Sequence, residues 1–140
     1  MSAQMLRVTA REALSPLVTR FRFEHPEGAA LPLFSGGAHV VVEMPDGDIL
    51  RRNAYSLISD PLDGSGYEIA VRREDGGRGG SVFLHRQVAV GDLLRISAPL
   101  NLFALDLRAK KHVMIAGGIG ITPFVAQLKQ LARLQMPFEL

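Results

Sequence analysis

Hydrophobic and polar residues alternate along much of the first hundred positions. The alternation is clearest at 19–23, where Thr-Arg-Phe-Arg-Phe places every second side chain on one face of an extended chain. Turn residues separate several such runs, and Pro-Asp-Gly-Asp at 45–48 is typical of a hairpin turn. The predicted strands are 6–10, 19–23, 39–44, 49–57, 67–73 and 93–97. Short strands at this spacing favour a small antiparallel barrel.

The pattern changes after residue 110. Residues 112–116, His-Val-Met-Ile-Ala, are typical of a buried strand, and a glycine-rich turn follows at 117–120. Thr122 and Pro123 are expected to begin a helix, with Thr122 as its cap and Pro123 as its first residue. Apolar residues then recur at steps of three and four, and 136–140 predicts a second strand.

These two patterns predict a mainly β protein with two parts. Residues 1–104 form the barrel domain, and residues 105–140 form a strand–helix–strand unit. A parallel sheet buried on both faces needs more strands than this unit supplies, so we expect the chain to end inside an incomplete second domain. The exposed edge of its last strand would allow two copies to pair as a homodimer.

Composition narrows the possible chemistry. The 140 residues include 47% hydrophobic and 21% charged residues, which is typical of a soluble globular protein. The absence of cysteine excludes a cysteine nucleophile, a disulfide scaffold and an iron–sulfur cluster held by this chain. The histidines lack metal-ligand spacing, so no metal site is predicted. A net charge of +2 with few aromatic residues disfavours nucleic acid as a partner.

The apolar runs are too short to predict a membrane span. The first residues show no basic start followed by a long apolar run, as a secretory signal peptide would need. We therefore expect a cytoplasmic protein with no membrane partner.

The segment 53–57, Asn-Ala-Tyr-Ser-Leu, is the first candidate for chemistry. It combines an aromatic ring, a hydroxyl group and main-chain donors at the end of a predicted strand. A flat, partly polar ligand could stack on Tyr55 and accept a hydrogen bond from Ser56. The alternative is an ordinary barrel strand with Tyr55 half-buried in the core, since aromatic residues are common in strands.

The segment 72–81 is the second candidate. Four glycines at 76–80 allow main-chain amides to approach an anion closely. Ser81 is expected to cap a helix at 82–87, whose N-terminus favours negative charge. Arg72 and Arg78 can add bidentate contacts to a phosphate. The alternative is a flexible, solvated loop followed by a capped helix.

The segment 117–123 is the third candidate. Glycines between a strand and a helix allow a phosphate or a ring to approach the helix N-terminus. The spacing does not match the dinucleotide fingerprint G-x-G-x-x-G, although the strand–glycine–helix context is the expected one.

In this order and at these distances, the segments resemble the flavin-binding domain of ferredoxin–NADP⁺ reductase-type oxidoreductases. The chain is most similar to the phthalate dioxygenase reductase and vanillate demethylase reductase branch, close to reductase components of carnitine-type Rieske monooxygenases. The motifs are Asn53-Ala54-Tyr55-Ser56-Leu57 with Asp60-Pro61, Ile69-Ala70-Val71-Arg72, Arg78-Gly79-Gly80-Ser81, Gly91-Asp92, Pro99-Leu100-Asn101-Leu102-Phe103 and Gly117 to Pro123. They cover essentially the whole chain.

The resemblance implies a six-stranded antiparallel Greek-key barrel followed by the start of an α/β nicotinamide-binding domain. It implies that Tyr55 stacks on the flavin ring, that Ser56 lies near flavin N5 and that Thr122 lies closest to the nicotinamide; these three form the implied catalytic set. The implied cofactor-binding residues are Asn53, Ala54, Tyr55, Ser56, Leu57, Ala70, Val71, Arg72, Arg78, Gly79, Gly80, Ser81, Gly117, Gly118, Gly120 and Thr122.

The function implied by the resemblance is electron transfer from NADH through flavin to an iron–sulfur centre that serves a Rieske-type oxygenase. FMN is the expected flavin and FAD the other possibility, while the [2Fe–2S] domain of full reductases is not in this chain. We expect this chain alone to oxidise NADH poorly. The alternative is a flavin carrier, or an empty barrel that acts as an interaction module without turnover.

One position departs from the family pattern. Many relatives carry Arg two residues before the tyrosine, as a phosphate ligand, and this chain has Asn53 there. Arg52 is not a simple substitute, because adjacent residues of a strand point to opposite faces. We expect Arg72 or Arg78 to supply the charge, helped by the amide of Asn53.

Overall fold

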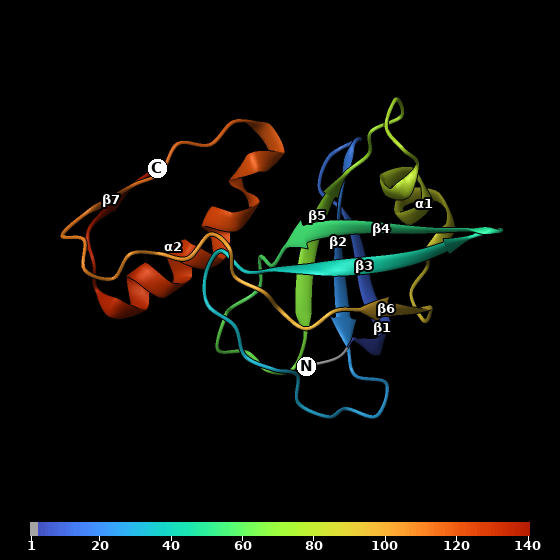
Figure 1. Cartoon of the computed structure of the whole chain (residues 1–140), viewed down its shortest axis with the longest axis horizontal. Coiled ribbons are helices and arrows are strands. Elements are labelled where there is room, and N and C mark those ends of the chain that lie inside the picture. Colours follow the sequence, from blue (N-terminus) through green and yellow to red (C-terminus); the bar gives the residue numbers. More distant parts are fainter. Residues whose placement is uncertain (1–2) are drawn as a thin grey trace.

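Six strands form one antiparallel sheet in the computed structural model, which describes residues 3–140 (Figure 1). The order across the sheet is β4-β3-β6-β1-β2-β5. The strands are β1 (Gln4–Ala13), β2 (Val18–Glu24), β3 (His39–Asp46), β4 (Ile49–Ser56), β5 (Tyr67–Arg72) and β6 (Leu93–Ile96). The predicted mainly β architecture with six antiparallel strands is therefore confirmed.

Alternation of side chains explains why these segments form a half-buried sheet. In β2, Phe21 and Phe23 are fully buried, and the arginine between them points outward. Strand β3 buries every second residue in the same way. The predicted hairpin joins β3 to β4 through a two-residue turn, in which Gly47 adopts a positive φ of 59°.

The sheet curls so that its two edge strands, β4 and β5, come into contact, and Figure 1 shows them crossing near the end of β4. Just beyond β4, the main-chain N–H of Ile58 donates to the carbonyl of Glu68, at 2.9 Å. The N–H of Glu68 donates to the Ser59 hydroxyl, at 3.1 Å. No ladder joins β4 to β5 themselves, so the barrel is open along this seam.

Helix α1 (Gly80–Gln87) packs Phe83 and Leu84 into the barrel core. It begins earlier than the predicted 82–87, and the prediction that Ser81 caps it was wrong. Gly79 stands at the N-cap position with φ 104°, so the chain turns into the helix through a left-handed glycine. The Ser81 hydroxyl instead accepts a hydrogen bond from the main-chain N–H of Glu74, at 2.9 Å.

The C-terminus of α1 is tied to the barrel by Arg11 of β1. Its guanidinium donates to the carbonyls of Leu84, at 3.2 Å, and of His85 and Val88. The same group lies over the Phe21 ring, 5.4 Å from its centroid. A cation at the C-terminal carbonyls of a helix complements the helix dipole. Arg11 therefore fixes the helix whose other end faces the groove described below.

Replacing Arg11 with Met is expected to lower the free energy of unfolding by about 2 kcal/mol, because carbonyl contacts and a cation–π contact are lost together. Thermal unfolding followed by circular dichroism measures this change. Arg86→Met is the matched control, because Arg86 is exposed and lies in the last turn of α1, next to His85, whose carbonyl Arg11 contacts. Equal melting temperatures for the two variants would contradict a stabilising role for the contacts between Arg11 and the C-terminal carbonyls of α1.

The remaining residues form a smaller unit beside the barrel. It contains β7 (His112–Val113), the 3-10 helix η1 (Gly118–Ile121), α2 (Thr122–Leu134) and β8 (Phe138–Glu139). Strands β7 and β8 pair in parallel, as a strand–helix–strand unit requires. Its own small core contains Met114, Phe124 and Leu131. Within residues 3–140, no helix is both long and apolar enough to cross a membrane.

Two local predictions in this unit were wrong. The strand expected at 112–116 is only two residues long, and Val113 and Ile115 are 65% and 88% exposed rather than buried. Thr122 does not cap the helix, because η1 runs directly into α2 and Ile121 occupies the N-cap position. Pro123 does lie in the first turn, where its missing N–H is tolerated.

Polar contacts hold α2 against the barrel. The buried Gln127 donates through Nε2 to the carbonyl of Phe103, at 2.6 Å. Gly36 touches the same helix, and a Cβ there would lie 2.6 Å from the Gln127 Cα. Arg133 pairs with Asp60 at 2.7 Å. These contacts hold the middle and the end of α2 against the barrel.

Candidate functional site

A groove runs along β4 and the open seam, and its parts share lining residues. The outer part, about 300 Å³ in volume, lies between β4 and the glycine-rich loop before α1. It is lined by Asn53, Tyr55, Arg72, Glu74, Gly77, Arg78, Gly79, Gly80 and Ser81. The middle part, about 370 Å³, lies between the seam and η1, and Tyr55, Arg72 and Glu74 line both. Ligand sites of small proteins commonly have such volumes.

Further hollows adjoin the middle part on either side. One of about 430 Å³ lies between β5 and η1, and Ala70, Ile119 and Thr122 belong to its walls. Another of about 420 Å³ lies beside Ser56 and Phe103. The groove is therefore bounded by the barrel on one side and by the start of α2 on the other.

Strand β4 presents Arg51, Asn53 and Tyr55 on one face, because they are two residues apart. The Asn53 amide donates to the Tyr55 hydroxyl, at 3.0 Å. Burial raises the pKa of the Tyr55 phenol, and the hydrogen bond from Asn53 opposes that rise only in part. Tyr55 is thus a neutral, oriented ring in the wall of the groove.

Strand β5 supplies a main-chain edge to the groove. The N–H and C=O of Glu68 point away from β2, since Ser59 and Ile58 bind them from the seam. With the strand period of two, the same groups of Ala70 and Arg72 point toward the seam. A flat ligand with donors and acceptors on its rim would meet a matching edge there.

The glycine-rich loop lies directly against β4. A Cβ on Gly80 would lie 3.0 Å from the Asn53 Cγ, and a Cβ on Gly79 would lie 2.8 Å from the Arg51 Cζ. Only glycine allows this approach. The first helical hydrogen bond of α1 runs from Phe83 N–H to the Gly79 carbonyl, at 2.9 Å. The amides of the preceding turn therefore point out of the helix end, where an anion would be stabilised.

Arg51 lies beside the groove, with its guanidinium against Gly79, and the sequence predictions did not include it. Its Nε donates to the Asp46 carboxylate, at 2.9 Å, and its Nη1 donates to the Arg78 carbonyl. The guanidinium holds the pKa of Asp46 below its usual value. The two-residue period from Asn53 was the signal that could have found it. Arg52 points to the opposite face and pairs with Glu43 at 3.3 Å.

Arg72 and Glu74 form an ion pair on the opposite wall, with 3.2 Å between their charged atoms. Glu74 was not predicted, and it is the carboxylate that lines both the outer and the middle part. Its charge is balanced by Arg72. Arg78, in contrast, is exposed and lies in the glycine-rich loop.

Most of the predicted cofactor-binding residues lie around this one groove. Those that line it are Asn53, Ala54, Tyr55, Ser56, Ala70, Arg72, Arg78, Gly79, Gly80, Ser81, Gly118, Gly120 and Thr122. The side chains of Leu57 and Val71 belong to the barrel core, the main chain of Val71 pairs with Thr19 of β2, and the Leu57 N–H donates to the Ala38 carbonyl, so neither residue lines the groove. Gly117 lies outside these linings, whereas Ile119 and Pro123, which belong to the third candidate segment but were not named as cofactor-binding residues, line the groove.

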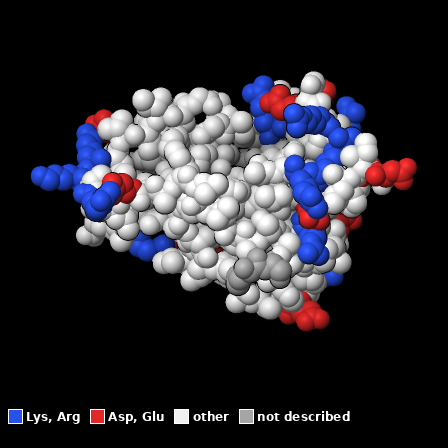
Figure 2. All heavy atoms as spheres, in the orientation of Figure 1, with Lys and Arg blue, Asp and Glu red and all other residues white. Residues whose placement is uncertain are grey.

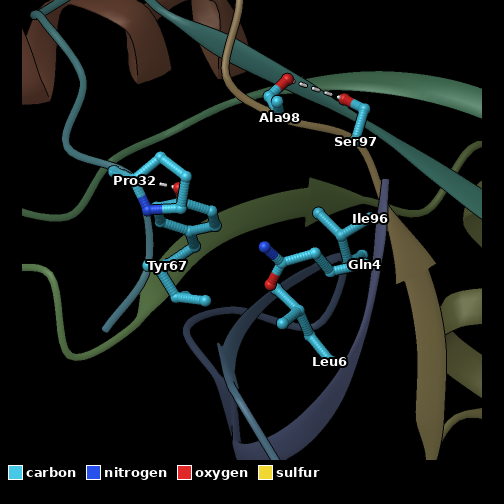
Figure 3. Close-up of a pocket in the computed structure, with 8 residues that line it drawn as sticks. Gln4, Leu6, Pro32, Tyr67, Ile96, Ser97 and Ala98 are labelled. Atoms are coloured by element: carbon cyan, nitrogen blue, oxygen red, sulfur yellow. Dashed lines mark hydrogen bonds between the residues drawn. The ribbon is translucent and has the colours of Figure 1, made fainter. Parts of the chain in front are cut away.

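A separate small cavity lies inside the barrel, between β1, β5 and β6 (Figure 3). Gln4, Tyr67 and Ile96 are among its walls, and its volume is about 10 Å³. This is room for about one water molecule, so the cavity is no candidate for a cofactor.

Charge is unevenly distributed on the surface. Figure 2 shows Lys and Arg side chains gathered at both ends of the molecule, with a broad uncharged face between them. Among the exposed apolar residues are Leu102 and Phe103, which are 79% and 52% exposed. Basic groups at the barrel end suit the anionic end of a ligand lying in the groove.

Comparison with known proteins gives consistent matches. Residues 5–105 match the family described as oxidoreductase FAD-binding domain. The carnitine monooxygenase reductase subunit of Escherichia coli (strain K12) is 52% identical over 135 residues, which are 96% of this chain and 42% of that protein. The heme-dependent oxidative N-demethylase beta subunit of Ectopseudomonas mendocina (strain ymp) is 50% identical, with the same two coverages of 96% and 42%.

A solved structure has a similar fold over nearly the whole chain. Phthalate dioxygenase reductase, described as a modular structure for electron transfer from pyridine nucleotides to [2Fe-2S], superposes with a TM-score of 0.91 and 37% sequence identity. The match covers 97% of this chain and 41% of that one. The chain thus spans about two fifths of the length of these relatives. With the family match over most of its length, the chain belongs to the oxidoreductase FAD-binding domain family.

Proposed function

We propose that this chain binds FMN in the groove along β4 and is the flavin-binding part of an NADH-dependent reductase. In this proposal, electrons pass from NADH through the flavin to an iron–sulfur centre that serves a Rieske-type oxygenase. The observation that carries the proposal is a pair of adjoining hollows that share Tyr55, Arg72 and Glu74 and that bring together the Tyr55 ring, the edge of β5 and the start of α1 at Gly80.

The residues present fit a flavin mononucleotide. The glycines at 79 and 80 form a cradle that a Cβ would fill, at the end of α1 where main-chain amides are free to bind phosphate. The Tyr55 ring offers a flat apolar face, and the β5 edge offers polar main-chain groups. Arg78 lines the outer part and the Arg51 guanidinium lies beside Gly79, so both cations suit a terminal phosphate. The short Gly79-Gly80-Ser81 segment offers no platform for the adenine of FAD.

When bound, the flavin supplies the redox chemistry, because it accepts a hydride and releases single electrons. The protein contributes position and electrostatics. Tyr55 would hold the ring plane by stacking, and Asn53 fixes the phenol that it bonds, at 3.0 Å. Ser56 lies at the end of β4, where its hydroxyl would donate toward N5 and orient the site of hydride arrival.

The side of the groove formed by η1 and α2 is the proposed entry for the nicotinamide. Gly118, Gly120 and Thr122 line it, and they offer close main-chain approach and a hydroxyl. We assign residues 105–140 as the start of a nicotinamide-binding unit on this basis, with the barrel ending at 104. An oxygenase component is the proposed final electron acceptor, by similarity to the named relatives.

An absorbance spectrum of the purified protein, with and without added FMN, tests the proposal. We expect bands near ~375 and ~450 nm that remain with the protein after gel filtration, and an FMN mass for the released pigment. An FAD mass would overturn the assignment of FMN and keep the flavin site. Protein that stays colourless in excess FMN and FAD would overturn the proposal and favour an interaction module. Bleaching by NADH distinguishes a reductase from a passive flavin carrier.

A further inference from the structure

The proposed flavin site has an ordered cation, Arg51, beside the glycine-rich loop. We propose that Arg51 is the residue that binds the FMN phosphate. This inference rests on the proposed function, and it concerns which side chain selects a phosphorylated flavin.

The first support is the register between β4 and the glycine loop. Two successive side chains on one face of β4 meet two successive glycines: Asn53 lies against Gly80, and Arg51 lies against Gly79. The guanidinium therefore lies beside Gly79, the N-cap residue of α1. An arginine is long enough to cover the distance of about 7 Å that two strand residues add.

The second support is that Arg51 is held in place. Its side chain is only 25% exposed, and Asp46 accepts from its Nε at 2.9 Å. Asp46 in turn accepts from Gln87 at the other end of α1, at 3.4 Å. Hydrogen bonds to Asp46 and to the Arg78 carbonyl use two edges of the planar guanidinium, and further N–H donors remain for an anion.

The third support is the state of the rival cations. Arg72 and Arg73 are also ion-paired, with Glu74 at 3.2 Å and with Asp75 at 2.9 Å, but their side chains are 45% and 31% exposed, against 25% for Arg51. Arg78 lies on the glycine-rich loop and is exposed, so ordering its long side chain around a phosphate would cost more conformational entropy than using the ordered Arg51. Arg51 is thus the cation that is already positioned.

The experiment compares the binding of FMN and riboflavin, which differ only in the phosphate. We expect Arg51→Gln to weaken FMN binding about tenfold to a hundredfold and to leave riboflavin binding within about twofold, since a charge-assisted hydrogen bond is lost. Flavin fluorescence titration at fixed ionic strength measures both. Arg52→Gln is the matched control, because that side chain is on the opposite face with Glu43, and it should change neither affinity.

Each outcome has a distinct meaning. The assignment of Arg51 is overturned if Arg51→Gln binds FMN within about twofold of the parent protein. It is also overturned if Arg78→Gln, and not Arg51→Gln, weakens FMN binding; in both cases the flavin site stands. Equal loss of riboflavin and FMN also overturns it, because the side chain would then support the pocket and not the phosphate. A parent protein that binds neither ligand overturns the proposed function itself. Unchanged circular dichroism and a melting temperature near that of the parent show that the variants fold, and Arg51→Lys, which keeps the charge, should fall between the two.

Discussion

Gly37→Ala is expected to lower the melting temperature by about 10 °C, through a loss of about 3 kcal/mol of folding free energy. Gly37 has φ +99°, a conformation that alanine adopts only with strain. A Cβ there would also overlap the carbonyl oxygen of Phe103 and lie 2.7 Å from the Gln127 Nε2. The hydrogen bond between these two groups holds α2 against the barrel, so the substitution disrupts the contact between α2 and the barrel.

Gly91→Ala separates the two causes of this loss. Gly91 has φ +100°, almost the same as Gly37, but nothing lies within 4 Å of a Cβ placed there. Its replacement should therefore show only the strain of the backbone, about 1 kcal/mol. The difference between the two variants in thermal unfolding reports the steric overlap alone. If the two variants lose the same free energy of unfolding, α2 moves to make room for the added methyl group and the overlap with Phe103 costs no stability.

Tyr55→Ala is expected to weaken FMN binding about tenfold to a hundredfold. Stacking of a flat ring on an aromatic side chain contributes about 1–3 kcal/mol, and tenfold in affinity corresponds to about 1.4 kcal/mol. Unlike the loss at Arg51, this loss should be the same for riboflavin, because the ring and not the phosphate is affected. Flavin fluorescence titration again gives both affinities.

Tyr55→Phe is the control for the phenol group. It keeps the ring and removes the hydroxyl that accepts from Asn53, so FMN affinity should stay within about threefold. Binding by Tyr55→Ala that matches the parent protein would show that the flavin ring lies elsewhere in the groove. Loss in Tyr55→Phe as large as in Tyr55→Ala would assign the effect to the hydroxyl and not to stacking.

The barrel was predictable because its signals are local. Strict alternation at 19–23 and the Pro-Asp-Gly-Asp turn specify a strand and a hairpin without reference to distant residues. The smaller unit was harder, because its burial depends on partners. Val113 and Ile115 look like a buried strand by composition, but in the structure they are largely exposed, while Met114 between them packs with Phe124 and Leu131 of α2.

The site was predictable in part, for a related reason. The segments around Tyr55, Gly79 and Thr122 carry recognisable motifs, and they do surround one groove. Arg51 carries no motif of its own: it stands after two exposed apolar residues and has an arginine neighbour. Its position beside the site follows from the packing of β4 against the glycine-rich loop. The start of α1 depended on the left-handed conformation of Gly79, which composition alone does not reveal.

The open seam between β4 and β5 leaves two strand edges without a ladder along part of their length. Unpaired edges are templates for association between chains, and proteins commonly blunt them with charge, as Arg52 and Arg72 do here. A ligand that fills the seam covers these edges and favours the folded state by mass action, by about 2.7 kcal/mol at a roughly hundredfold excess over its dissociation constant. If the proposed flavin fills the seam, we expect its loss to expose these edges and to favour aggregation, so excess flavin should slow aggregation during storage.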